Sequence, residues 1–165
     1  MSEASSSKIG RVLLLVGRLV LGGIMVYAAS TKLHPPLGVS LSFFAMEVDS
    51  YQLLPANLVS RFAHVLPFVE LILGLLLIVG WPLRTVATAT TALLAGFFGV
   101  MVRTYALGLE ISCGCFGSGE KLGTKTLLRD GTLLALSIGV AVGAFLLRRH
   151  KLESPAAQPV PQRAE

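Results

Sequence analysis

The chain has 165 residues, of which 53% are hydrophobic and only 14% charged, so it is too apolar for a soluble domain of this length. Its net charge of +5 comes from lysines and arginines near the ends of apolar runs, a distribution that sets membrane orientation and argues against a nucleic-acid partner. The polar sequence between those runs is too short for a separate soluble catalytic domain. We therefore expect the lipid bilayer to be the main surroundings of the chain.

Four apolar segments reach the length of about 20 residues that a helix needs to cross the hydrocarbon core. They cover residues 9–30, 62–80, 86–107 and 127–147. Small residues recur in the last three segments and permit close approach between helices. Together the segments predict an all-α fold, a four-transmembrane-helix bundle.

Two connections between these segments have distinctive sequences. The first, "GWPLR" at 80–84, predicts a tight turn, because Trp81 suits the headgroup interface and Pro82 discourages helix continuation. The second and third helices should therefore be antiparallel neighbours. The longer segment 31–61 contains "FFAMEVDSYQLLP" and is typical of a short amphipathic or re-entrant element over the mouth of the bundle.

The expected organisation is a short cytoplasmic N-terminus at 1–8, a membrane domain at 9–147, and a tail at 148–165 that is basic and then disordered. Six lysines and arginines near segment ends lie on the side of the termini and five on the other side, which is almost a tie. The dense "RRHK" at 148–151 and Arg84 in the short turn favour a multi-pass protein of the plasma (inner) membrane with cytoplasmic termini. Cleavage of the first segment as a signal peptide is the weaker alternative, because that segment is long and Arg18 interrupts it.

Both cysteines of the chain lie in "SCGCFG" at 112–117, separated by one glycine. In the predicted orientation they face the oxidising side of the membrane, where disulfides persist. A ring closed by Cys113 and Cys115 would be strained, and strained accessible disulfides exchange readily with other thiols. An inert local disulfide is the alternative, but it would gain little stability from so short a loop. Phe116 is either an interfacial anchor of the loop or a docking surface beside the thiols.

A metal role for the two cysteines is a further interpretation. A pair of thiolates suits Cu(I), and the residues that would complete the coordination are His34, His64 or Met101. None of these lies at a diagnostic spacing from the cysteines, so we predict no metal site.

Ionisable residues inside apolar spans are costly and are usually paired. Arg18 and Glu70 each lie about 14 Å from the same face of the membrane by helical rise, which predicts an ion pair between them. The same arithmetic places Arg103 level with Asp130, and this second pair would clamp the base of the cysteine loop. The pairs are either purely structural, or Glu70 carries protons and Arg103 favours a thiolate. Lys32 is either a snorkelling interfacial cation or a second positive group facing the thiols.

Five motifs resemble, in order and spacing, the MauE branch of the MauE/DoxX family of small four-helix membrane proteins. They are "GRLVLGGIMVYAASTKL" (17–33), "YQLLP" (51–55), "LPFVELILGLLLIVG" (66–80), "SCGCFG" (112–117) and "LLRD" (127–130). The resemblance covers about residues 9–147, and it implies a role in methylamine utilisation through maturation of the disulfide-rich small subunit of methylamine dehydrogenase. It also implies that Cys113 and Cys115 are the redox pair. The positions that match the polar residues of the family are Arg18, Lys32, Glu70, Arg129 and Asp130. The chain departs from the family in lacking an aromatic residue shortly before its Arg-Asp.

The functional prediction is an integral membrane thiol–disulfide protein, whether or not it acts as an oxidoreductase enzyme. A thiolate of an exported client would attack the Cys113–Cys115 disulfide and form a mixed disulfide, whose resolution leaves the client oxidised and the cysteine pair reduced; a thioredoxin-like protein is the expected partner for reoxidation. Because the chain has only two cysteines, reoxidation requires a partner or a quinone held between the helices, and no sequence feature identifies a quinone site. The competing prediction is a non-catalytic scaffold of a maturation or respiratory complex.

Overall fold

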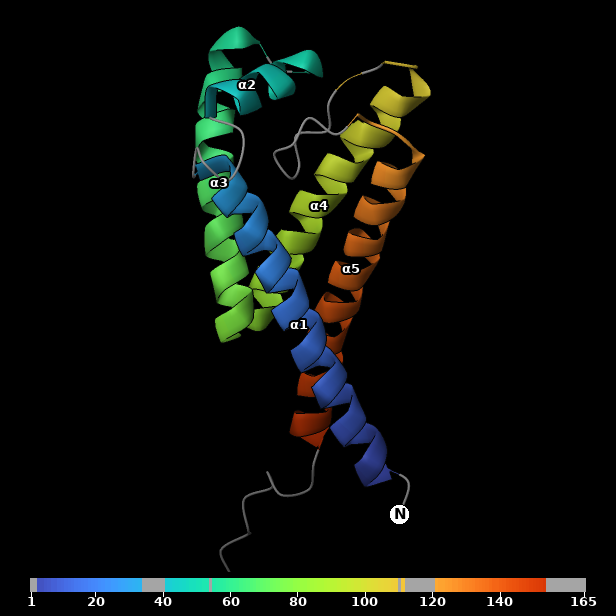
Figure 1. Cartoon of the computed structure of the whole chain (residues 1–165). Helices are drawn as coiled ribbons and strands as arrows, with labels where there is room; N and C mark the ends of the chain where they lie inside the picture. Colours follow the sequence, from blue (N-terminus) through green and yellow to red (C-terminus); the bar gives the residue numbers. More distant parts are fainter. Residues whose placement is uncertain (1–2, 34–40, 54, 110, 112–120, 154–165) are drawn as a thin grey trace, which may run out of the picture.

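The computed structural model describes residues 3–33, 41–53, 55–109, 111 and 121–153, and almost all of these are helical. The helices are α1 (Glu3–Leu33), α2 (Leu41–Ser50), α3 (Ala56–Val79), α4 (Leu83–Ala106) and α5 (Thr124–Glu153) (Figure 1). All but α2 contain a stretch long and apolar enough to cross a membrane. These stretches are Lys8–Leu33, Asn57–Val79, Leu83–Ala106 and Thr124–Leu146. The predicted all-α architecture with four transmembrane helices is confirmed.

The helix ends follow local backbone chemistry more closely than hydropathy. α3 begins directly after Pro55, six residues before its predicted apolar segment, because proline is well tolerated just before or in the first turn of a helix. α3 ends at Gly80, which adopts the left-handed conformation (φ 83°) common at helix C-termini, and α4 begins directly after Pro82. The predicted tight turn between these two helices is therefore confirmed.

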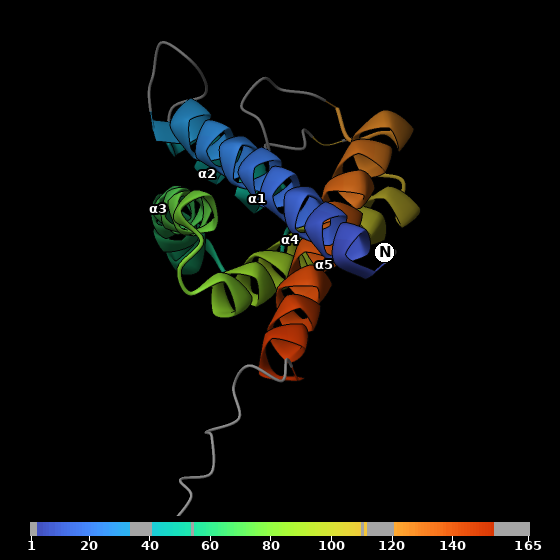
Figure 2. The same ribbon diagram turned by 90° about the horizontal axis from the view of Figure 1, so that it is seen from below.

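The long helices form two packed pairs rather than a ring of sequential neighbours. α1 packs most extensively on α3, α4 packs on α5, and α1 also contacts α5. α3 and α4 meet near their turn and separate toward the end where α2 lies, as Figures 1 and 2 both show. The start of α1 and the end of α5 share the opposite end of the molecule, as expected for four crossings (Figure 1).

A close crossing of α1 and α3 depends on two glycines. A Cβ atom at Gly22 would lie 2.8 Å from the carbonyl oxygen of Gly74, and one at Gly74 would lie 2.9 Å from the carbonyl oxygen of Gly22. Backbones can approach this closely only where side chains are missing, which is how small residues promote helix association in lipid. The crossing therefore fixes the relative position of α1 and α3.

The interior has two apolar clusters, and the outer faces of the helices are apolar too. One cluster joins α1, α3, α4 and α5 around Leu21, Leu77 and Val140, and the other lies beneath α2 around Phe44 and Leu66. Large apolar side chains remain exposed along every long helix, as contact with lipid tails requires. The composition and this surface both support a lipid bilayer as the surroundings.

The predicted short element between the first two membrane helices is α2, which packs on α3. Its burial differs from that of a soluble amphipathic helix, because Glu47 is buried beside Phe44, whereas Phe43 and Met46 are exposed by 55% and 67%. An apolar outer face suits a helix that lies at the membrane interface. The inner face of α2 therefore carries an acidic residue into the bundle.

Candidate functional site

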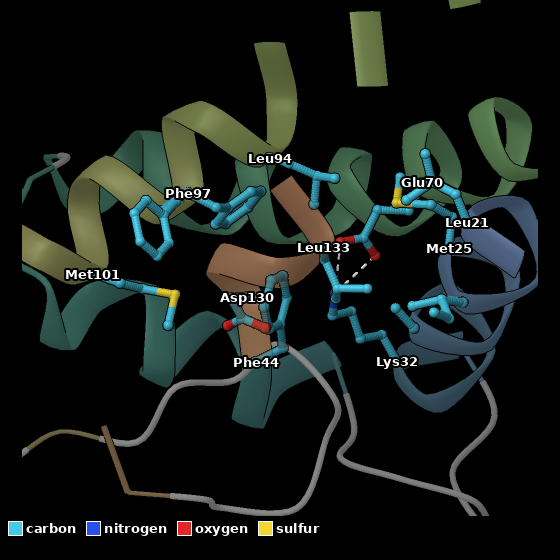
Figure 3. Close-up of a pocket in the computed structure, with 13 residues that line it drawn as sticks. Leu21, Met25, Lys32, Phe44, Glu70, Leu94, Phe97, Met101, Asp130 and Leu133 are labelled. Atoms are coloured by element: carbon cyan, nitrogen blue, oxygen red, sulfur yellow. Dashed lines mark hydrogen bonds and ion pairs between the residues drawn. The ribbon is translucent and has the colours of Figure 1, made fainter. Parts of the chain in front are cut away.

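A buried ion pair joins the last turn of α1 to the middle of α3. Lys32 Nζ donates hydrogen bonds to both carboxylate oxygens of Glu70, at 2.8 and 2.7 Å (Figure 3). The two side chains are only 2% and 9% exposed. Lys32 therefore does not snorkel to the interface, and its charge is neutralised inside the protein.

The glycine crossing explains why these two residues meet. From the crossing, Lys32 lies about 15 Å along α1 and Glu70 about 6 Å along α3, both toward the α2 end. Side chains on a helix tilt toward its N-terminus, and α1 and α3 run in opposite directions. The Lys32 and Glu70 side chains therefore tilt toward each other and close the remaining distance.

The predicted ion pair between Arg18 and Glu70 is wrong. Arg18 lies on the other side of the glycine crossing, and its guanidinium packs against Gly80 at the C-terminus of α3. A cation is favoured there by the partial negative charge of the helix end. Depth along two separate spans cannot give the register between them, and the crossing sets that register differently from the prediction.

The predicted clamp between Arg103 and Asp130 is also wrong. Asp130 accepts a hydrogen bond from Arg129 Nε at 3.1 Å, and among the described residues no ion pair joins it to Arg103. Arg103 is exposed, whereas Met101 and Thr104 are buried, so Arg103 projects from the outer face of α4. A prediction from helical rise alone does not include the rotation of Arg103 around the helix axis.

Two neighbouring cavities lie in this part of the bundle, and the ion pair lines the smaller one. The smaller has a volume of about 60 Å³ and is lined by Lys32, Glu70 and Asp130 among apolar side chains (Figure 3). The larger has a volume of about 360 Å³ and lies between α2, α3 and α4. Both cavities share the side chains of Phe44, Phe97 and Met101.

Glu47 is the acidic residue of the larger cavity. It is 5% exposed, and neither of its carboxylate oxygens has a hydrogen-bond partner among the described residues. Burial raises the pKa of Glu47, and the positive charge of Lys32 opposes this only in part. Lys32 Nζ also lies 5.0 Å from the centre of the Phe44 ring, a cation–π distance. Lys32 thus interacts with residues of both cavities.

Glu47 and Phe44 are site residues that were not predicted from the sequence. A signal was present in the spacing, because Phe44, Glu47 and Tyr51 are three and four residues apart and share one helical face. The spacing lies in the segment 31–61, which was interpreted as a connection between membrane helices. A single acidic residue in a connection does not indicate a functional site. Only the packing of α2 on α3 shows that this face is turned inward.

The predicted residues Cys113, Cys115 and Phe116 lie outside the described residues. The chain on either side of them is held together, since the Leu122 amide donates a hydrogen bond to the Ile111 carbonyl at 2.8 Å. The end of α4 and the start of α5, the helices on either side of this segment, lie at the α2 end of the molecule (Figure 1). The helices before and after the cysteine segment therefore end and begin at the end of the bundle that holds the Lys32–Glu70 pair.

Of the residues considered as Cu(I) ligands, some lie within the described part of the chain and others do not. His34 lies outside the described part of the chain, and His64 is exposed, with Nδ1 2.7 Å from the Ser60 carbonyl oxygen. Met101 is buried and lines both cavities. Within the described ranges, no group of three His, Cys, Asp or Glu side chains is arranged to hold a metal ion.

Four apolar helices with a charged pair and an acidic cavity near one end define a multi-pass helical membrane protein with a polar site in its interior. The family model "Methylamine utilisation protein MauE" matches residues 10–146, and the chain belongs to this family. The match covers the four described membrane-crossing stretches except for the first two residues of the first, together with the Cys-Gly-Cys motif. No curated protein sequence and no solved structure matches the chain.

Proposed function

We propose that this MauE-family protein is a membrane thiol–disulfide redox protein in which Cys113 and Cys115 are the reacting pair. The observation that carries the proposal is the position of the end of α4 and the start of α5, the helices on either side of the cysteines, at the same end of the bundle as the Lys32–Glu70 pair. Thiol exchange moves protons and negative charge, so it benefits from charged and proton-holding groups nearby. Family membership supports a role in methylamine utilisation.

The proposed reaction oxidises an exported client. One client thiolate attacks a sulfur of the Cys113–Cys115 disulfide, forms a mixed disulfide and releases the other cysteine as a thiolate. The second client thiol, as its thiolate, then attacks the client sulfur of the mixed disulfide and releases the second cysteine of the pair as a thiolate. The client gains one disulfide and loses two electrons and two protons, and the cysteine pair is left as two thiols. The client implied by the family is the small subunit of methylamine dehydrogenase, and a thioredoxin-like protein is the alternative partner.

The reaction requires the cysteines to lie outside the cytoplasm. We propose a plasma (inner) membrane location with both termini in the cytoplasm. Arg84 supports this orientation, because it lies at the end shared by the termini and donates hydrogen bonds to the carbonyls of Ala144 and Phe145 at 3.3 Å. Arg148, Arg149 and Lys151 follow in the same helix and add positive charge at that end.

The test is alkylation in intact cells with a membrane-impermeant maleimide, before and after mild reduction, read as a mobility shift. Labelling only after reduction is expected, because the pair would be an outward-facing disulfide. Labelling without reductant would indicate free outward thiols and contradict the oxidising role, and absence of labelling under both conditions would contradict the orientation.

A second measurement separates redox chemistry from a scaffold role. The purified protein in lipid nanodiscs should oxidise a reduced dithiol peptide, and Cys113→Ser with Cys115→Ser should abolish the reaction. Met46→Cys is a matched control in that double variant, since it restores an exposed thiol at another site and should not restore activity. A scaffold would support methylamine utilisation equally well with both cysteines replaced.

A further inference from the structure

We propose that the larger cavity binds the head group of a lipid-soluble quinone, and that Glu47 donates a hydrogen bond to one of the quinone carbonyl oxygens. The role of this quinone as electron acceptor rests on the proposed function. Its binding does not, because it is argued from described residues that line the cavity and from no property of the cysteines.

The size and lining of the cavity suit a flat apolar ring. Its volume of about 360 Å³ is comparable to that of small-molecule sites in other proteins. Three phenylalanines, Phe44, Phe62 and Phe97, lie on its walls and come from α2, α3 and α4 in turn. Aromatic side chains around a planar ligand allow stacked and edge-to-face contacts. The rest of the lining is mostly aliphatic, so the cavity would reject a strongly polar ligand.

Glu47 adds a buried carboxyl group to this mostly apolar cavity, whose lining also includes Tyr51. Both of its oxygens lack partners among the described residues, although a buried polar group is normally hydrogen-bonded. Burial raises the pKa of Glu47, so its protonated form, which can donate a hydrogen bond, is favoured. A ligand with a carbonyl acceptor and an otherwise apolar surface would satisfy this group.

The edge of the cavity is formed by residues that face the surroundings of the bundle. Leu53 and Phe62 are 43% and 38% exposed, and Ala92 and Gly96 on α4 are exposed as well. Phe62, Ala92 and Gly96 lie within membrane-crossing stretches. A molecule dissolved in the bilayer could therefore enter between α3 and α4 without passing through water.

An organic cation fits the cavity less well, although carboxylates and aromatic rings often bind cations. Lys32 already occupies the cation position at the Phe44 ring, at 5.0 Å from the ring centre. A second cation beside Glu47 would be repelled by Lys32 and would have to enter from lipid. The neutral carbonyl ligand avoids both costs.

A quinone also balances the proposed reaction. Reoxidation of the reduced Cys113 and Cys115 breaks two S–H bonds, forms one S–S bond and releases two electrons and two protons. A quinone takes up both electrons and both protons at its two carbonyl oxygens and becomes a quinol. A cycle of client oxidation and quinone reduction then leaves the protein unchanged.

The test is photolabelling of the protein in phosphatidylcholine nanodiscs with an azido-substituted short-chain benzoquinone, followed by peptide mapping. We expect labels in residues 44–53 and 92–101, and competition by decylubiquinone. Gly96→Leu should lower this labelling about tenfold, because the new side chain fills the cavity edge. Gly99→Leu is the matched control, since Gly99 is exposed on the same helix, does not line the cavity, and should leave labelling unchanged.

Substitutions of Glu47 test the hydrogen bond. Glu47→Gln keeps a donor and should retain labelling within about threefold, whereas Glu47→Leu should lower it about tenfold, the factor expected from losing one hydrogen bond. Asp49→Asn, an exposed neighbour on α2, should have no effect. Thermal unfolding of each variant confirms that it is folded, and Ala92→Leu replaces Gly96→Leu if the latter does not fold.

Three outcomes would overturn the inference. They are labels scattered over the lipid-facing helices, equal labelling of wild type and the cavity variants, and competition by tetramethylammonium instead of decylubiquinone. Labelling should persist in the variant with both cysteines replaced by serine. If labelling fails while the maleimide and peptide assays succeed, the quinone site is refuted and the thiol function stands.

Discussion

The Lys32–Glu70 pair allows a double-mutant cycle with a large expected signal. Each single change, Lys32→Met or Glu70→Met, would leave one buried charge without its partner. Such a change costs about 3–5 kcal/mol in the free energy of unfolding, whereas replacing both charges by apolar residues is neutral or stabilises by about 1–4 kcal/mol. Lys32 is hydrogen-bonded to both carboxylate oxygens of Glu70, and both side chains are less than a tenth exposed. Each single variant should therefore be destabilised by an amount near the upper end of the range of about 3–5 kcal/mol. We expect the sum of the single effects to exceed the double effect by at least about 6 kcal/mol.

The assay is unfolding in mixed micelles titrated with sodium dodecyl sulfate, followed by far-ultraviolet circular dichroism. Lys125→Met is the control, because Lys125 is exposed near the start of α5 and its loss should change the free energy by no more than about 0.5 kcal/mol. Single effects below about 1 kcal/mol, or single effects that simply add in the double variant, would refute the inference that the pair is buried and coupled.

Two further predictions concern the helix crossing and the acidic cavity. Gly22→Ala should destabilise the fold by about 1–3 kcal/mol, because its methyl group meets the Gly74 carbonyl, whereas Gly23→Ala, with open space around it, should stabilise α1 by about 0.5–1 kcal/mol. Equal changes in the free energy of unfolding for Gly22→Ala and Gly23→Ala, measured in detergent, would contradict the close crossing of α1 and α3. The raised pKa of Glu47 means that the unfolded chain loses this proton first, so stability should fall as the pH rises from about 4.5 until the folded pKa is passed. Glu47→Gln should remove the part of this fall in stability that Glu47 causes. If the stability of the variant and that of wild type change with pH in parallel, Glu47 does not cause any of the fall.

The parts of the fold that depend on chain composition were predictable. Length and hydropathy identify four spans to within a few residues, and proline and glycine identify the turn between α3 and α4. The segment 31–61 was correctly expected to hold a short element. In each case the signal lies in consecutive residues, so no knowledge of tertiary packing is required.

The pairing of charges was not predictable by the same means. Arg18, Lys32 and Glu70 were all recognised as buried or interfacial charges, but the partner of Glu70 depends on the register of α1 against α3. That register is fixed by the contact of Gly22 with Gly74, two glycines among many in apolar helices. Helices that are apolar on all sides carry little periodic signal to show which face is turned inward.

Among the charged residues near the two cavities, Glu47 is the one best suited to exchange protons in the proposed reaction. Lys32 and Glu70 neutralise each other when both are ionised, and two hydrogen bonds join them. Ionised Glu47 would add an uncompensated negative charge in a buried site, whereas protonated Glu47 leaves Lys32, Glu70 and Glu47 together neutral. Of these three residues, Glu47 alone can therefore exchange a proton without breaking an ion pair. Its side chain lines the cavity proposed for the electron acceptor, where each two-electron reduction also consumes two protons.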